Sequence, residues 1–229
     1  EGKIAPSILW CGADHEPPYE AKEIRQMGAK GLQCKIKTPK TEFAVTIPAL
    51  GNHMIYPVLM ACAIGEKFGM TGEEMKKGVE AFVPTKMRMN VIRQGDVTIL
   101  DDAYNANPQS MRAAVEVLSG TNADYKVAVL GDMFELGEQE KEMHARVGKY
   151  AADKGVECII CAGKLARCIY EGAREAAGER KDGPAAEIFY FEDRESLLEG
   201  INQILKPGDT ILIKASHGMG FEKVVEQLS

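Results

Sequence analysis

The sequence has little tryptophan and histidine, few cysteines and no long apolar run. Among 229 residues there are one tryptophan, four histidines and six cysteines, and the formal net charge is −6. The acidic balance excludes nucleic-acid binding through a basic face. No apolar run reaches the roughly 20 residues that span a bilayer, and Glu1 opens no signal-peptide pattern. These absences favour a soluble cytoplasmic protein without membrane insertion.

The cysteines and histidines form no pattern typical of a metal or disulfide site. Cys158 and Cys161 have CxxC spacing, but a structural zinc would need a second matching pair, which the sequence lacks. Because the pair lies inside an apolar run, we expect buried thiols in a strand. His15 and His144 have no second ligand at metal spacing, so His144 is interpreted as a surface or packing residue. The sequence predicts no metal site.

The first third of the chain predicts a hairpin followed by helices. Residues 32–37 and 43–48 alternate between apolar and polar side chains, which indicates two antiparallel strands. A mostly apolar helical stretch covers 52–70. Thr71–Glu74 has the spacing of a capping box, in which each side chain bonds the other residue's backbone. That motif predicts a second helix, which Pro84 ends.

From residue 91 onward, apolar runs alternate with helical patterns, which indicates an α/β fold. Short continuous apolar runs are typical of parallel strands that are covered on both faces. The expected strands are 97–100, 127–130, 158–162, 188–191 and 210–213, and the expected helices lie near 108–119, 138–154, 163–178, 193–205 and 218–228. Together they predict an open, mostly parallel, Rossmann-like sheet with helices on both faces. We place the boundary between the two parts near Pro84–Met87.

Two loops at the expected carboxyl ends of strands carry polar side chains, where ligands bind in such sheets. In Asp101–Asn107, Asp102 and Tyr104 suit a ribose, a metal-linked water or a peptide, or simply form a turn. Asn107 is placed to cap the following helix. In the loop 214–220, a lysine and a serine precede a helix N-terminus, which suits a phosphate or carboxylate.

Two other classes of protein, dinucleotide-binding domains and phosphoacceptor signalling domains, agree less well with the sequence. Gly218–Gly220 matches half of a dinucleotide fingerprint, but Lys223 stands where the third glycine belongs. A phosphoacceptor signalling domain also has five βα units, and Asp101–Asp102 and Lys214 match its outline. Its phosphorylated aspartate closes the third strand, however, where this chain has Ala162–Gly163. We therefore reject the phosphoacceptor interpretation.

Taken together, these motifs resemble those of the Mur ligase family. The segments that carry the resemblance are 101–111, 129–137, His144 with Gly148, and 211–216, and it extends over 51–88 and the preceding hairpin. The resemblance implies an ATP-dependent peptide ligase of peptidoglycan synthesis. The first two segments point to the branch that adds D-Ala-D-Ala to UDP-MurNAc-tripeptide.

The resemblance also implies a domain organisation. Mur ligases have a UDP-substrate domain, a central ATPase domain and a C-terminal Rossmann-like domain, but this sequence has no Gly-x-x-x-x-Gly-Lys-Ser/Thr loop. Nor does it have an upstream lysine that could be the family's carbamylated metal-site residue. We therefore expect a fragment, with 1–86 as the C-terminal part of the central ATP-binding domain and 87–229 as the C-terminal domain. Such a fragment would be monomeric and inactive alone.

The family's reaction implies ATP and Mg²⁺ as cofactors. The tripeptide carboxylate attacks the γ-phosphate to form an acyl phosphate, and the amine of D-Ala-D-Ala then displaces phosphate. Magnesium and cationic side chains offset the charge that gathers on the transferred phosphoryl group.

The resemblance assigns roles to matching residues. Arg88 matches an arginine that approaches the ATP phosphates and is the expected catalytic residue, although from the sequence alone it is a solvated hinge residue. His53 corresponds to a residue beside the adenine pocket, and Asp102 to the acid that reaches the ribose. Tyr104 completes the expected nucleotide site. The expected substrate-binding residues are Asn105, Asn107, Asp132, Lys214 and Ser216.

Several positions depart from the family pattern. Met54 and Pro57 replace two asparagines that commonly serve adenine, and His217 replaces an arginine, which removes a permanent cation. Two alternatives therefore stay open. One is a sister Mur ligase or a folylpolyglutamate synthase with another amine acceptor, and the other is a stand-alone nucleotide- or protein-binding module without chemistry.

Overall fold

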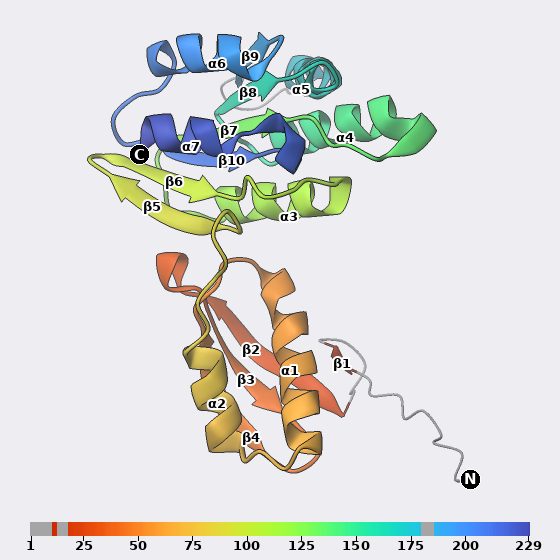
Figure 1. The fold of residues 1–229 in the computed structure, drawn as a ribbon, viewed down its shortest axis with the longest axis vertical. Coiled ribbons are helices and arrows are strands. Elements are labelled where there is room, and N and C mark those ends of the chain that lie inside the picture. The colour runs from red at the N-terminus through yellow and green to blue at the C-terminus, as the bar shows by residue number, and fades with distance from the viewer. Residues whose placement is uncertain (1–10, 13–17, 180–185) are drawn as a thin grey trace. The chain divides into compact units, whose positions relative to one another are not determined.

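The computed structural model describes residues 11–12, 18–179 and 186–229 of the chain (Figure 1). The chain divides into two compact units, residues 1–83 and 84–229. Each unit has its own sheet and its own apolar core. No helix in the described ranges is long and apolar enough to cross a membrane.

The first unit contains a four-stranded sheet. Its strands lie in the order β1 (Cys11–Gly12), β2 (Tyr19–Gln26), β3 (Leu32–Lys37) and β4 (Glu42–Ile47). The predicted hairpin is confirmed, since β3 and β4 pair antiparallel with Cys34 opposite Val45. The strand β2 was not predicted, because a register shift between Lys22 and Arg25 interrupts its alternation.

Two helices pack on this sheet. A 3-10 turn at Asn52–Met54 leads into α1 (Ile55–Lys67), and α2 (Gly72–Glu80) follows. The predicted capping box is confirmed at Thr71, whose hydroxyl accepts from the Glu74 backbone N–H while the Glu74 carboxylate accepts from the Thr71 N–H. The helix ends at Glu80, earlier than Pro84 suggested. The largest fully buried side chains of this core are Leu32, Ile36, Ile47 and Leu59.

A buried carboxylate on α1 hydrogen-bonds to β2 and to the residue that follows β3. Glu66 is 5% exposed, and it accepts hydrogen bonds from the hydroxyls of Thr38 (2.5 Å) and Tyr19 (3.0 Å). Burial acts to raise the pKa of Glu66, but these hydrogen bonds outweigh it, so the pKa lies below the usual value. The ionised form is therefore the one that the fold stabilises.

The second unit contains a six-stranded sheet in the order β5-β6-β10-β7-β8-β9. Its strands are β5 (Asn90–Gln94), β6 (Val97–Asp101), β7 (Lys126–Gly131), β8 (Cys158–Ala162), β9 (Glu187–Phe191) and β10 (Thr210–Lys214). All neighbours pair parallel except β5, which forms an antiparallel hairpin with β6. The five predicted strands are confirmed. The edge strand β5 was missed because it lacks a buried apolar run.

Helices cover both faces of this sheet (Figure 1). They are α3 (Pro108–Ser119), α4 (Glu140–Asp153), α5 (Ala166–Glu179), α6 (Arg194–Gly200) and α7 (Glu222–Leu228). Leu197 of α6 and Val224 of α7 share one core with alternate strand residues such as Ile160 and Ile211. The predicted mostly parallel α/β sheet is confirmed. Several helices are shorter than predicted because 3-10 turns occupy 137–139, 201–203 and 217–219.

The helices α4 and α5 cross at two glycines. A Cβ added to Gly148 would lie 1.8 Å from the Ile169 carbonyl oxygen, and one added to Gly172 would lie 2.2 Å from that of Ala145. One turn before Gly148, His144 is fully buried. Its Nε2 accepts from the Met133 N–H at 2.8 Å, and its Nδ1 donates to the carbonyl of Glu140. Of the two interpretations, a surface residue or a packing residue, the structure supports the packing residue.

The CxxC pair lies in the buried strand β8, as predicted. Burial raises the pKa of Cys158 to about 12 and also raises the pKa of Cys161. Thiols held in the protonated form are poor nucleophiles and poor metal ligands. The two cysteines therefore serve as small core residues.

Candidate functional site

The carboxyl ends of β6 and β10 bring the two polar loops together. The strands are neighbours, with Leu100 opposite Leu212. The Lys214 Nζ donates to the Asp102 Oδ2 at 2.6 Å and to the Asn105 carbonyl at 2.8 Å. Lys214 is only 2% exposed. The lysine thus joins two loops that lie more than a hundred residues apart in the sequence.

Asp102 is hydrogen-bonded through both carboxylate oxygens. While Oδ2 pairs with Lys214, Oδ1 accepts from the backbone N–H of Met89 at 3.1 Å. The preceding Asp101 is buried, and burial raises its pKa although backbone hydrogen bonds from Ala103 and Met87 act in the opposite direction. The acidic pair therefore fixes the backbone on both sides of Arg88.

Arg88 itself is exposed and lies against an aromatic ring. Its guanidinium carbon is 4.0 Å from the centroid of the Tyr104 ring. The two segments are joined by a backbone hydrogen bond of 3.1 Å from the Tyr104 N–H to the Met87 carbonyl. A guanidinium over an aromatic face is attracted by the ring quadrupole. The cation and the ring thus form one exposed surface.

His217 extends that surface from the other loop. Its ring centroid lies 5.6 Å from that of Tyr104, with 30° between the ring planes. Both side chains are exposed. From the sequence, His217 was expected only as a departure from the family pattern and not as a residue of the site. Its position directly after the β10 loop serine was the signal that could have found it.

Two further predicted residues are buried near the adjoining strand end of β7. The Ser216 Oγ accepts from the Phe134 N–H at 2.9 Å. The Asp132 Oδ1 accepts from the Ala166 N–H at 2.6 Å, at the start of α5. Asp132 packs so closely on Gly163 that a Cβ there would lie 2.3 Å from its Oδ1. Both polar side chains hold neighbouring loops in place.

The two asparagines of the first loop differ in their surroundings. The Asn107 Oδ1 accepts from the Ser110 N–H at 2.8 Å and caps α3, as the sequence predicted. Asn105 is exposed, and its Oδ1 accepts from the neighbouring Ala106 N–H. The exposed predicted residues of the second unit are thus Arg88, Tyr104, Asn105 and Asn107, whereas Asp132, Lys214 and Ser216 are buried and Asp102 is half-buried.

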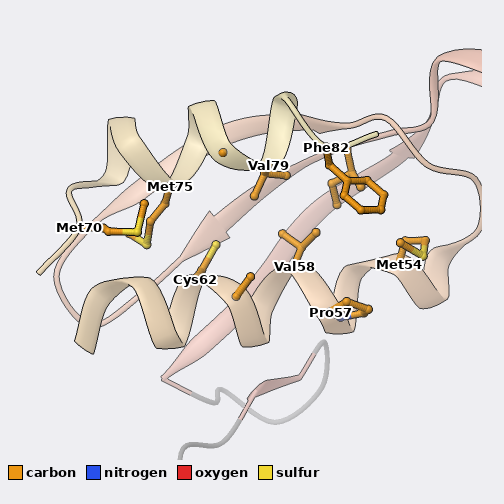
Figure 2. Close-up of a pocket in the computed structure, with 11 residues that line it drawn as sticks. Met54, Pro57, Val58, Cys62, Met70, Met75, Val79 and Phe82 are labelled. Atoms are coloured by element: carbon orange, nitrogen blue, oxygen red, sulfur yellow. The ribbon is translucent and has the colours of Figure 1, made fainter. Parts of the chain in front are cut away.

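His53 lies in the first unit, exposed on the 3-10 turn before α1. The neighbouring departures, Met54 and Pro57, line an apolar pocket of about 370 Å³ between α1 and α2. Figure 2 shows Met54 and Pro57 on the α1 side of the pocket, with Val79 and Phe82 opposite. The lining side chains, Met54 and Pro57 among them, are mostly apolar.

Within the described ranges, no three His, Cys, Asp or Glu side chains gather as a metal-binding group. The polar groups of the second-unit site instead bond to one another and to backbone. The site is suited to anions and rings, through the exposed guanidinium and aromatic faces.

Comparison with known proteins shows which family the chain belongs to. Residues 87–217 match the family described as "Mur ligase, glutamate ligase domain". The chain belongs to the Mur ligase family. The matched residues include those of the second-unit site, from Arg88 to His217.

Individual relatives give the same result over most of the chain. A UDP-N-acetylmuramoyl-tripeptide–D-alanyl-D-alanine ligase from Bacillus subtilis is 32% identical over 212 residues, which are 92% of this chain and 44% of that protein. A crystal structure of MurF from Acinetobacter baumannii aligns with a TM-score of 0.82 and 28% identity, covering 93% of this chain and 45% of that one. This Mur ligase chain therefore spans less than half the length of these relatives.

A third relative shows the same fold at lower identity. The MurF ligase from Thermotoga maritima, solved in complex with ADP, aligns with a TM-score of 0.76 and 22% identity. The alignment covers 96% of this chain and 47% of that one. Both units therefore have the fold of the corresponding parts of a Mur ligase.

Proposed function

We propose that this chain is part of an ATP-dependent ligase that adds D-Ala-D-Ala to UDP-MurNAc-tripeptide in peptidoglycan synthesis. Residues 87–229 form its C-terminal Rossmann-like domain, and residues 1–86 form the C-terminal part of its central ATP-binding domain. The relatives that carry this activity in their names support the substrate assignment. The chain alone is expected to be inactive, because it has no phosphate loop to hold ATP.

The observation that carries this proposal is the joint exposure of Arg88 and Tyr104 beside Asp102. A guanidinium can offer two parallel donors to a phosphate, and an aromatic face can pack on a nucleoside. A half-buried carboxylate retains lone pairs that can accept from a ribose hydroxyl. Arg88 therefore suits the phosphates of ATP, and Tyr104 and Asp102 suit its ribose side.

In the complete enzyme, Arg88 acts on the phosphates, where charge gathers during transfer to the tripeptide carboxylate. We assign Asp102 and Tyr104 to the ribose side of ATP, and His53 to its adenine side. Because Met54 and Pro57 supply no amide, the adenine edge relies on apolar contact and on backbone groups.

For the peptide substrates, we assign direct contact to Asn105, which is exposed in the loop after β6. The site is supported by three buried residues whose polar atoms hydrogen-bond the surrounding loops, namely Asp132, Lys214 and Ser216. Asn107 contributes the remaining exposed amide edge next to its capping contact. The substrate-binding role of this set is therefore partly direct and partly structural.

The family's Mg²⁺ finds no ligand set among the described residues. When bound to the complete enzyme, the ion would offset phosphate charge. We expect the enzyme to be cytoplasmic and monomeric. Light scattering after gel filtration would test the monomeric state.

The test compares this chain with the complete protein. Phosphate release is measured with ATP, magnesium, UDP-MurNAc-tripeptide and D-Ala-D-Ala. We expect release above a buffer blank only from the complete protein, and only when both peptide substrates are present. Release that is driven equally well by another amine, such as glutamate, would favour a sister ligase. Substrate-dependent release by this chain alone would contradict the fragment assignment.

A further inference from the structure

The backbone around Arg88 adopts an unfavourable conformation. Its two neighbours, Met87 and Met89, have φ values of 61° and 53°. Side chains with a Cβ rarely adopt this left-handed region, and neither position is a glycine. Such residues persist only where surrounding contacts determine the backbone. The contacts that hold the Met87 and Met89 backbone should therefore determine the direction of the Arg88 side chain.

Hydrogen bonds from the loop after β6 hold both neighbours. The Met87 carbonyl accepts from the Tyr104 N–H at 3.1 Å. The Met89 N–H donates to the Asp102 Oδ1, also at 3.1 Å. Arg88 lies between these two anchors, and its own N–H donates to the Thr85 carbonyl. The position of Arg88 over the Tyr104 ring thus depends on where Asp102 and its loop lie.

Lys214 in turn fixes Asp102. Its ammonium group bonds the second carboxylate oxygen of Asp102 and the Asn105 carbonyl, so it holds the same loop at two points. The side chain is 3% exposed, which leaves it no surface for a substrate. A buried cation is stable only with such partners, because burial without them is strongly unfavourable.

We propose that Lys214 is a positioning residue, which acts through Asp102 to hold the Met87–Met89 backbone and thereby sets Arg88 over Tyr104. The proposal concerns the arrangement of residues in this chain. The consequence for turnover rests in addition on the proposed function, in which Arg88 meets the phosphates of ATP.

The first experiment measures amide hydrogen exchange by NMR in the 229-residue chain. Lys214→Met removes the charge while keeping a similar length and an apolar stem. We expect exchange at the Met89 amide to rise about tenfold while exchange in the central strand β8, for example at Ile160, stays unchanged. Lys206→Met is the matched control, since Lys206 lies before the opposite end of β10 and its side chain is 62% exposed. Unchanged exchange at Met89 in Lys214→Met would overturn the proposal.

A second variant covers the case in which Lys214→Met does not fold. Asp102→Asn keeps an oxygen but loses the charge that Lys214 holds, so the amide group cannot satisfy Lys214 and Met89 as the carboxylate does. Exchange at Met89 should again rise relative to Ile160. Equal protection of Met89 in this variant and in the wild type would likewise overturn the proposal.

The second experiment uses the complete enzyme and a double-mutant cycle. Lys214→Met should lower kcat about tenfold with little change in KM for D-Ala-D-Ala, and it should add nothing to Arg88→Ala. A raised KM with additive effects would instead make Lys214 a substrate contact and overturn the positioning role. If Met89 exchange rises but Arg88→Ala retains full turnover, the role of Arg88 in the proposed function fails while the positioning by Lys214 stands.

Discussion

The guanidinium of Arg88 and the ring of Tyr104 lie in cation–π contact, with 4.0 Å between the guanidinium carbon and the ring centroid. At an exposed site such a contact contributes only about 0.5–1 kcal/mol. Its importance is geometric, because it keeps a flexible cation on one side of a fixed ring. The pair therefore presents a positive charge beside an aromatic ring on one exposed surface.

We expect Arg88→Ala to lower turnover of the complete enzyme about a hundredfold while changing KM for the tripeptide by less than about threefold. A charge that acts mainly in the transition state affects kcat more than binding. Arg88→Lys should recover only part of the loss, since lysine lacks the planar pair of donors. Single-turnover kinetics checks this, and wild-type rates in Arg88→Ala would contradict it.

Tyr104 provides a separate test of the nucleotide surface. Tyr104→Leu removes the ring that Arg88 and His217 contact, and we expect KM for ATP to rise about tenfold. Tyr104→Phe keeps the ring and should stay within about twofold of the wild type. Steady-state kinetics with varied ATP distinguishes the two variants. Equal losses in both would assign the role to the hydroxyl instead of the ring.

The crossing of α4 and α5 predicts a large stability effect from one methyl group. Gly148→Ala places a Cβ 1.8 Å from the Ile169 carbonyl oxygen, so the helices must separate, which should cost about 2–3 kcal/mol. Gly178→Ala is the matched control on α5, because a Cβ there meets nothing within 4 Å. Urea denaturation of the second unit checks both. A neutral Gly148→Ala would show that the crossing adapts easily.

The carboxylate of Glu66 predicts how the first unit responds to acid. Because the folded state lowers the pKa of Glu66, its contribution to stability is present above the unfolded value of about 4.3 and is lost as pH falls through the lower folded value. Glu66→Gln should destabilise the first unit by about 1–2 kcal/mol at pH 7. The difference from the wild type should shrink below about pH 4.

Urea denaturation at several pH values, followed by NMR signals of Ile36 and Leu59, measures the effect of Glu66→Gln in the first unit. Glu42→Gln is the control, since Glu42 is exposed on β4. A difference between Glu66→Gln and the wild type that grows toward low pH would contradict the assigned direction of the pKa change.

Much of the second unit could be predicted from its sequence because its strands are buried on both faces. Continuous apolar runs mark such strands, and parallel pairing brings their carboxyl ends to one edge. That rule was enough to expect the loops of Asp102 and Lys214 at the same edge of the sheet. Their direct contact also requires β6 and β10 to be neighbours, which the sequence did not predict. The strand β5 escaped detection because an edge strand needs no apolar run.

The arrangement of Arg88 could not be predicted in the same way. Left-handed backbone is signalled by glycine or asparagine, and Met87 and Met89 give no such signal. Their conformation follows from hydrogen bonds to Tyr104 and Asp102, which exist only once β5 and β6 have paired. Likewise, the burial of Lys214 depends on the neighbouring strands and not on its own segment.

The loop after β6 is attached at both ends. Asp102 is fixed at its start by Lys214, and Asn107 is fixed at its end by the reciprocal cap of α3. An inserted or deleted residue between these two points would move Tyr104 and Asn105 relative to Arg88 and Lys214. Variation among relatives should therefore appear here as exchange of side chains and not as a change of length. A change of specificity toward another amine acceptor would accordingly require side-chain replacements within a loop of unchanged length.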